Sequence, residues 1–358
     1  MAAQFQAYTV FCIGYVDGVI SPEARALHER YPAIDLHADT LMWARWVGYD
    51  MRRRHNAPLP RAALGGHVDV PRLREGGIGA QFFGLVSVPI GQKRGLARVI
   101  DEQIDELDTV VGTDPSLVKV QSALDIDRVT GAGKIAALLG IEGAHSLEGD
   151  LAKLEHFARR GVRYLGFCHF SANDACAPAY GWGRDDEQGL TSFGKDLVHR
   201  CEDLGVIVNL AHINRKGFFD ACALSKKPLW VSHTGVLGAY AHWRNIDDTQ
   251  LRAVAKTGGC VGVIFCPRYL GGDGLEAVVQ HLKHILDTVG EDGAALGSDW
   301  DGLIVPTRDL CDAAQLPRLT DALLQARISE RVIGKILRDN AMRVLGDNPP
   351  KLVLRDTL

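Results

Sequence analysis

The sequence has no block of basic residues, no paired cysteines at metal-binding spacing and no low-complexity linker. Its 40 Lys and Arg and 44 Asp and Glu are interspersed, which gives a formal net charge of −4 and a pI near 6.3. Because nucleic-acid-binding surfaces carry clustered positive charge, we expect no nucleic-acid partner. The 8 cysteines never form Cys-x-x-Cys, and a chain of 358 residues far exceeds a disulfide scaffold. We therefore expect reduced, buried thiols in a cytoplasmic protein.

The sequence also lacks the features of a membrane anchor. Residues 8–20 are apolar, but Asp17 interrupts them and no Lys or Arg precedes them. They are too short to span a bilayer, and we expect an edge strand or hairpin within an N-terminal extension of residues 1–32 packed on the domain. The C-terminal tail, residues 347–358, carries no hydrophobic segment that could be exchanged for a lipid anchor. We expect no association with a membrane.

Short apolar runs recur along the chain, separated by helix-like segments. Eight of them are candidate strands: residues 33–36, 80–88, 135–141, 162–167, 206–210, 229–232, 260–265 and 294–296. Most are apolar throughout, which is typical of parallel strands covered on both faces. Eight strand–helix units predict one (β/α)₈ barrel, a TIM barrel, as a single domain over residues 1–358. An open doubly wound sheet is the alternative, although no G-x-G-x-x-G follows the first strand as a dinucleotide fold requires.

The segments between the runs carry helical periodicity. Residues 275–289 place apolar side chains three and four apart on one stripe, with Asp273 as a candidate cap and Gly290 as the end. Residues 191–205 and 245–259 likewise run into a glycine before the next strand. This is the turn expected in a strand–helix repeat.

Ionisable residues recur where the predicted strands end, which is where a barrel keeps its chemistry. The first run ends in His37-Ala38-Asp39, and alternation along a strand puts the first and third of these side chains on one face. Later runs end in Glu142, His169, His212, His233 and Asp299, with Asp301 two residues on. Taken singly, each residue has a structural explanation as a core or rim histidine, a helix cap or a turn former. Their coincidence at one end of the barrel favours a shared site.

Several other histidines show no such pattern. They lie in helix-like or loop segments, and we expect them at the surface: His28, His55, His156, His199 and His281.

Three imidazoles with an Asp and a Glu are a suitable ligand set for a divalent metal. Five ligands exceed what one tetrahedral zinc needs, so we predict two ions. His37 and Asp39 hold one, His212 and His233 hold the other, and Glu142 bridges them. Two ions about 3.5–4 Å apart can share a water, lower its pKa and polarise a carbonyl or phosphoryl oxygen.

Several ordered segments resemble the membrane (renal) dipeptidase family of zinc metallopeptidases, which belong to the amidohydrolase-like barrels. They are "LHAD", "GIEGAHSL", "GVRYLGFCHF", "GVIVNLAH", "PLWVSHTG", "WRNIDD", "ALGSDWDG" and "ISERVIGKILRDNAMRVL", and they run from about residue 33 to 346. The resemblance implies a homodimer with two Zn²⁺ per chain that hydrolyses dipeptides, including those with a D-residue on the C-terminal side. It implies that a metal-bridging hydroxide attacks the scissile carbonyl.

The resemblance also implies residue roles. The five predicted metal ligands match the family's ligand positions. His169 matches the histidine that contacts substrate and steadies the tetrahedral intermediate, Arg244 the arginine that takes the substrate's carboxylate, and Asp299 the acid that handles the proton. We expect loops 173–184 and 267–274 to form the two substrate pockets.

Three segments depart from the family's usual residues. His37-Ala38-Asp39-Thr40-Leu41 stands where His-Asn-Asp-Leu-Pro is usual, and Asn209-Leu210-Ala211-His212 where Asp-Leu-Ser-His is usual. Phe167-Cys168-His169 stands where Leu-Thr-His is common. The ligands are retained, and we expect the residues at 209 and 211 to alter hydrogen bonds to His212.

Other interpretations stay open from the residues alone. His169 could simply form a hydrogen bond at the barrel rim, and Arg244 could form a surface ion pair with Asp247 or Asp248. The same metals could serve lactone, β-lactam or N-acyl-amino-acid hydrolysis, because one fold hosts many chemistries. The chain could also be a catalytically silent metal-binding relative, although a binding role does not need the proton shuttle of Asp299.

Overall fold

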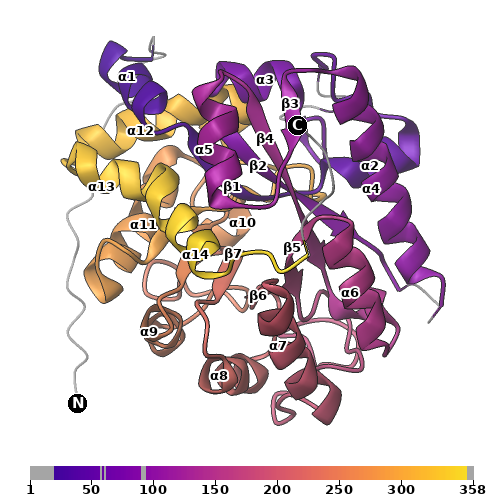
Figure 1. The fold of residues 1–358 in the computed structure, drawn as a ribbon. Coiled ribbons are helices and arrows are strands. Elements are labelled where there is room, and N and C mark those ends of the chain that lie inside the picture. Colours follow the sequence, from indigo (N-terminus) through magenta and orange to yellow (C-terminus); the bar gives the residue numbers. More distant parts are fainter. Residues whose placement is uncertain (1–19, 57–58, 60–61, 90–93, 353–358) are drawn as a thin grey trace, which may run out of the picture.

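The computed structural model describes residues 20–56, 59, 62–89 and 94–352 (Figure 1). Residues 8–19, most of the predicted edge strand or hairpin, lie outside this part of the chain. Within the predicted N-terminal extension, helix α1 (Pro22–Arg30) is capped by Ser21, whose side chain accepts from the backbone N–H of Ala24. The backbone N–H of Ser21 in turn donates to Asp321 of helix α12 (3.1 Å), so that α1 packs against the last helices of the chain.

All eight predicted strands are present and parallel. Their bounds are β1 Ala33–Ala38, β2 Ile78–Val86, β4 Ile135–Glu142, β5 Val162–Gly166, β6 Ile207–Asn209, β7 Trp230–Thr234, β8 Cys260–Val263 and β9 Ala294–Leu296. Their order in the sheet is β2-β1-β9-β8-β7-β6-β5-β4, and β2 also pairs with β4. This last pairing closes the sheet, which confirms the barrel and excludes the open doubly wound alternative.

A ninth strand, β3 (Leu117–Lys119), was not predicted. It pairs with residues 135–137 of β4, while β5 pairs with residues 139–141 of the same strand. Strand β3 therefore extends the sheet at the start of β4 without taking a place in the closed barrel. Three residues ending in a lysine are too short and too polar to stand out as an apolar run.

Helices surround the strands (Figure 1). Their bounds are α1 Pro22–Arg30, α2 Thr40–Val47, α3 Val70–Glu75, α4 Leu96–Thr113, α5 Ala123–Gly131, α6 Leu151–Arg159, α7 Ser192–Leu204, α8 Arg215–Leu224, α9 Asp248–Lys256, α10 Pro267–Leu270, α11 Leu275–Val289, α12 Leu316–Gln325, α13 Glu330–Gly334 and α14 Asn340–Asp347. Among the described residues, none of these helices has the length and apolar character that crossing a bilayer requires.

Helix α11 has the predicted bounds and ends at Gly290, whose φ of +83° favours glycine. Its N-cap is Gly274, so the prediction that Asp273 caps it is wrong. Helix α7 also ends as predicted, at Gly205 in the left-handed conformation. These glycine-ended helices turn the chain back into the next strand.

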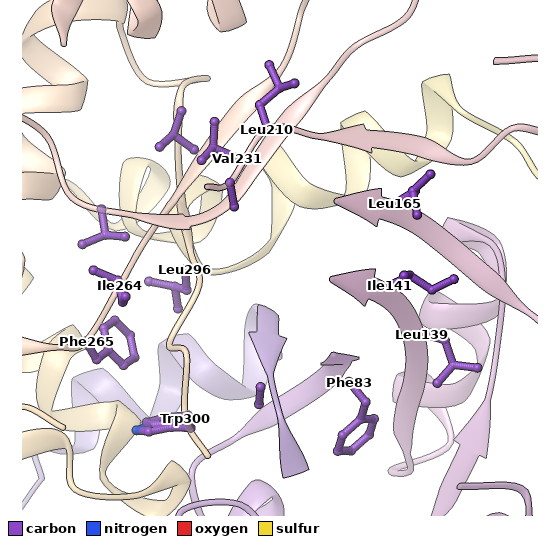
Figure 2. Close-up of a cluster of buried hydrophobic side chains, with 14 of the residues drawn as sticks. Phe83, Leu139, Ile141, Leu165, Leu210, Val231, Ile264, Phe265, Leu296 and Trp300 are labelled. Carbon is purple, nitrogen blue, oxygen red and sulfur yellow. The ribbon is translucent and has the colours of Figure 1, made fainter. Parts of the chain in front are cut away.

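Apolar side chains fill the barrel and the layer around it. The rings of Phe82, Tyr164 and Trp230 lie with centroids 5.1–5.6 Å apart, although they come from strands β2, β5 and β7, which do not pair. They therefore meet inside the barrel. Side chains one position along, such as Phe83 and Leu165, belong to a second cluster that joins strands to helices (Figure 2). This double packing explains why the strands are apolar throughout.

Two histidines expected at the surface are buried. His28 is 5% exposed and its Nε2 lies 2.8 Å from Thr320 Oγ1, while His281 is fully buried. The prediction was wrong for both, because a helical pattern does not show what packs on each face. His55 is half-buried, and His156 and His199 are exposed.

The described cysteines are mostly buried. Five are buried thiols without a disulfide: Cys168, Cys176, Cys201, Cys260 and Cys266. Cys222 and Cys311 are half-buried, and Cys12 lies outside the described residues.

Candidate metal centre

The structure gathers all eight predicted site residues at one end of the barrel. His37 and His233 lie within β1 and β7, and Glu142 is the last residue of β4. The others follow strand ends: Asp39, His169, His212, Arg244 and Asp299. His212 and Asp299 have φ of +66° and +61°. Non-glycine residues rarely adopt this left-handed conformation, which concentrates at functional sites.

Glu142 lies at the centre of the group. Its Oε1 is 3.1 Å from Nε2 of His212, 3.4 Å from Nε2 of His233 and 3.6 Å from Nε2 of His37. Its Oε2 is 3.6 Å from Nε2 of His169. One buried carboxylate thus faces four imidazoles that come from four different strand ends.

Three overlapping groups place possible ligand atoms within 4.8 Å of one another. They are His37, Glu142 and His233; Glu142, His169 and His212; and His37, Asp39 and Asp299.

Two buried polar atoms of the centre have no hydrogen-bond partner in the described part of the chain. His37 Nε2 and Asp39 Oδ1 are buried, lie 3.2 Å apart and form no hydrogen bond within the described chain. His212 and His233 bring their Nε2 atoms to 2.9 Å from each other. A buried polar atom without a partner costs about 1–3 kcal/mol, and a cation between these atoms would satisfy them. The residues therefore fit a metal centre.

The protonation states of His212, His233 and Glu142 suit metal binding. Burial lowers the pKa of His212 to about 3, with a further contribution from Arg244, and burial lowers the pKa of His233 well below its ordinary value. Burial alone would raise the pKa of Glu142, but the neighbouring His169 and His37 hold that pKa well below its ordinary value. Near pH 7 His212 and His233 are therefore neutral and Glu142 is ionised, which are the ligand forms of these groups. Burial alone would lower the pKa of His37, but Tyr164, Asp39 and Glu142 together outweigh burial and raise that pKa well above its ordinary value.

The carboxyl group of Asp299 differs from that of Glu142 in the direction of its pKa shift. Burial raises the pKa of its carboxyl group well above the ordinary value, and the nearby Asp39 and Glu142 add to that rise although His37 opposes it. Its Oδ1 lies 3.8 Å from Nε2 of His37 and 3.9 Å from Nε2 of His233. A carboxyl group with a raised pKa beside the centre can hold and release a proton.

The outer ring nitrogens of two candidate ligands are held by hydrogen bonds. His37 Nδ1 lies 2.6 Å from the hydroxyl of Tyr164, and His233 Nδ1 lies 2.9 Å from Ser232 Oγ. Asn209 Nδ2 donates to the same Ser232 Oγ (2.8 Å). Asn209 is thereby linked to His233 through Ser232, and the effect of the residues at 209 and 211 on the hydrogen bonds of His212 stays a prediction. The sequence analysis missed Tyr164 and Ser232, which stand in apolar strands with no signal of their role.

Arg244 is buried rather than at the surface. It is 5% exposed, and it donates to the backbone carbonyl of His233 (2.8 Å) and to Thr234 Oγ1 (3.3 Å). Asp247 accepts instead from Arg215 (2.9 Å), and Asp248 lies 2.7 Å from Nε2 of His284. The alternative of a surface ion pair is wrong, and the guanidinium lies at the candidate centre.

Asp301 has a structural role. It accepts from the backbone N–H groups of Gly66 and His67 (2.8 Å each) and from Thr40 Oγ1 (2.6 Å). Its carboxylate thereby fixes the loop that follows α2.

Two cavities adjoin the centre. The larger, about 880 Å³, is lined by His212 and Arg244 and by residues of the loops after β5 and β7. The smaller, about 490 Å³, is lined by Phe170, Tyr180, Gly181, Trp182 and Arg184. The loop 173–184 thus contributes to both cavities, as expected, whereas residues 267–274 line neither.

A barrel that collects imidazoles and carboxylates at its strand ends defines the class of metal-dependent hydrolases. The family of this chain follows from its sequence as a whole. The model of the membrane dipeptidase family, peptidase family M19, matches residues 21–349, and the chain belongs to this family. It is a metallo-dipeptidase by class.

Individual dipeptidases and metallopeptidases also match this chain. Dipeptidase tcpJ of Claviceps purpurea (strain 20.1) is 31% identical over 299 residues, which cover 80% of this chain and 70% of that protein. The crystal structure of dipeptidase AC, a metallopeptidase of family M19, matches with a TM-score of 0.79 and 26% identity over 88% of this chain and 98% of that one. A metallopeptidase from Rhodobacter sphaeroides, solved with a phosphinate mimic of the dipeptide L-Ala-D-Ala, matches with a TM-score of 0.78 and 25% identity over 89% and 99% of the two chains.

Proposed function

We propose that this protein hydrolyses the peptide bond of dipeptides at a centre of two zinc ions. The proposed substrates include dipeptides with a D-residue on the C-terminal side, because a family relative was solved with a mimic of L-Ala-D-Ala. We also propose a cytoplasmic homodimer, on the family resemblance and on the buried thiols.

The position of Glu142 carries the proposal. Its Oε1 faces the Nε2 atoms of His212, His233 and His37 at 3.1–3.6 Å. His37 and Asp39 would hold one ion, His212 and His233 the other, and Glu142 both. When bound, the ions would lower the pKa of a water at the centre and polarise the scissile carbonyl.

We assign His169 to the oxyanion. Its side chain is 16% exposed, and its Nε2 lies 3.6 Å from Glu142 Oε2, so a partly exposed ring adjoins the buried carboxylate. An N–H from this ring would donate to the oxygen that becomes negative as the carbonyl carbon turns tetrahedral. Loss of one such donor typically raises the barrier by about 3 kcal/mol.

We assign Asp299 to proton transfer. Its Oδ1 would accept a proton from the attacking water and pass it to the nitrogen of the leaving amine. Its raised pKa and its position beside both His37 and His233 support this role.

We assign Arg244 to the substrate's C-terminal carboxylate. The guanidinium is anchored by the carbonyl of His233 and by Thr234 Oγ1, and it lines the 880 Å³ cavity next to His212. A planar guanidinium binds a carboxylate through two parallel hydrogen bonds. A carboxylate held so near the centre would place the peptide bond of a dipeptide, rather than that of a longer chain, at the reacting position.

A substrate panel with a metal count tests the proposal. We expect about two zinc ions per chain, turnover of dipeptides, loss of turnover on chelation and recovery on adding zinc. The panel includes Ala-Ala with an L- or D-residue at the C-terminal side, N-acyl amino acids, a lactone and a β-lactam. Turnover of the other classes without dipeptides would reassign the reaction. No turnover of any substrate by fully loaded protein would identify a silent binding relative.

A further inference from the structure

Four aromatic side chains stand exposed beside the candidate metal centre. Phe170, Tyr180 and Trp182 follow β5, and Trp243 follows β7; their exposed fractions are 38%, 50%, 66% and 37%. Exposed aromatic side chains gathered at a cavity mark a binding surface more often than isolated surface residues do.

The loop after β5 holds these rings in place. The backbone N–H of Trp182 donates to the carbonyl of Phe170 (2.9 Å), and that of Ala172 donates to the carbonyl of Trp182 (2.8 Å). Gly181 has a φ of +117°, and a Cβ there would collide with the carbonyl oxygen of Phe170. The backbone N–H of Ala179 donates to the carbonyl of His212 (2.8 Å), which ties the loop to a candidate metal ligand.

The rings also lie in a defined arrangement around the centre. The Phe170 ring centroid is 4.6 Å from that of His169 and 5.0 Å from that of His212. Tyr180 and Trp243 stack at 4.3 Å with 23° between their planes, although they belong to different loops. Phe170, Tyr180 and Trp182 line the 490 Å³ cavity, while Trp243 lines the 880 Å³ cavity together with Arg244.

The smaller cavity has the chemistry of an apolar subsite. Its lining holds three aromatic rings, Gly181 and Arg184, and no carboxylate. The guanidinium of Arg184 is paired with Asp186 (2.6 Å). Rings held by their backbone present a large apolar surface with little conformational freedom to lose, and they pack well against aromatic or large aliphatic groups.

Resting on the proposed function, we propose that the cavity formed by Phe170, Tyr180 and Trp182 binds the N-terminal side chain of the dipeptide and selects large apolar or aromatic residues there. Arg244 fixes the orientation, because it places the C-terminal carboxylate on the side of the larger cavity. The scissile carbonyl then lies at the metal centre. The side chain of the N-terminal residue points to the other side, where the Phe170 ring adjoins His169 and His212.

Steady-state kinetics with paired dipeptides tests this assignment. We expect kcat/KM for Phe-Ala to exceed that for Ala-Ala by at least about tenfold, with a much smaller difference between Ala-Phe and Ala-Ala. Phe170→Ala and Trp182→Ala should each lower the ratio of kcat/KM for Phe-Ala over Ala-Ala by about tenfold. Phe170→Leu, which keeps an apolar side chain, should retain most of the ratio.

Trp46→Ala is the matched control, because this tryptophan is 47% exposed but lines neither cavity. It should leave the ratio unchanged, and metal content and melting temperature are compared for every variant. Three results would overturn the assignment while dipeptidase activity stands. They are equal kcat/KM for Phe-Ala and Ala-Ala, a preference for a large side chain at the C-terminal residue instead, and an unchanged ratio of kcat/KM in both Phe170→Ala and Trp182→Ala. Absence of turnover on every dipeptide instead overturns the proposed function.

Discussion

The hydroxyl of Tyr164 lies 2.6 Å from Nδ1 of His37, and both side chains are fully buried. This contact fixes the ring of His37 so that its other nitrogen, Nε2, faces Asp39 and Glu142. Hydrogen bonds of this kind orient a metal-binding histidine and set which nitrogen carries the proton.

Tyr164→Phe removes that hydroxyl and keeps the ring. We predict that the affinity for the metal falls about 10–100-fold, because the His37 imidazole loses its outer partner. Competition with a chromophoric chelator measures the affinity directly. Tyr49→Phe removes a comparable hydroxyl, which donates to the carbonyl of Val68 (3.0 Å), and serves as the control. Equal affinities for the two variants would show that Tyr164 does not act on the metal centre.

Gly140 makes room for the Tyr164 ring inside the barrel, because a Cβ at this position would overlap the ring. Gly140→Ala should therefore lower the free energy of unfolding by about 1–3 kcal/mol. The control is Gly112→Ala in α4, where a Cβ meets nothing within 4 Å. That exchange should leave stability unchanged or raise it by up to about 1 kcal/mol. Urea unfolding of both variants measures the difference, and equal stabilities would contradict the packing argument.

The burial of His281 leads us to predict that the stability of the protein depends on pH. The backbone N–H of Val236 donates to its Nδ1 (2.9 Å), and its Nε2 lies 3.3 Å from the carbonyl of Leu270, so the ring is neutral. Burial lowers the pKa of His281 from 6.5 to about 4. Between these two values the unfolded chain binds more protons than the folded one, so stability falls as the pH falls. From pH 7 to pH 5 this histidine should remove about 2 kcal/mol.

His281→Gln isolates that contribution from the other histidines. The free energy of unfolding of the wild type and of the variant is measured in urea at pH 7 and at pH 5. Between these two pH values the wild type should lose about 2 kcal/mol more of it than the variant. Parallel losses in both proteins would mean that His281 keeps its ordinary pKa on folding.

Arg244→Lys tests the proposed carboxylate clamp. Lysine keeps the charge but loses the paired donors, so we predict that KM for Ala-Ala rises at least about tenfold with a smaller change in kcat. The C-terminal amide of the same dipeptide lacks the carboxylate and provides the control substrate. Its kinetics should change much less. A similar change for both substrates, or an unchanged KM, would separate Arg244 from substrate binding.

The barrel could be predicted from the sequence because its strands are packed on both faces, which leaves uninterrupted apolar runs. Strand β3 could not, because three residues with one lysine carry no such signal. Residue type favours Asp273 as the N-cap of α11, but the N-cap is the next residue, Gly274. Caps depend on backbone angles that residue type alone does not determine.

The candidate site, too, could be predicted only in part from the sequence. Chemically distinctive residues at strand ends, such as His37 and Glu142, could be found by position. Tyr164 and Ser232 could not, because a buried hydroxyl in an apolar strand looks like ordinary core. The aromatic rings at 170, 180 and 182 are brought together only in the folded loop, where the backbone N–H of Trp182 donates to the carbonyl of Phe170. The sequence alone does not show that they share a cavity.

Anomalous diffraction from crystals of the zinc-loaded protein tests the central claim most directly. The account predicts two peaks at the strand ends of the barrel, one beside His37 and Asp39 and one beside His212 and His233, with the carboxylate of Glu142 reaching both. A single peak, no peak at this end of the barrel, or two peaks that Glu142 does not touch would contradict it.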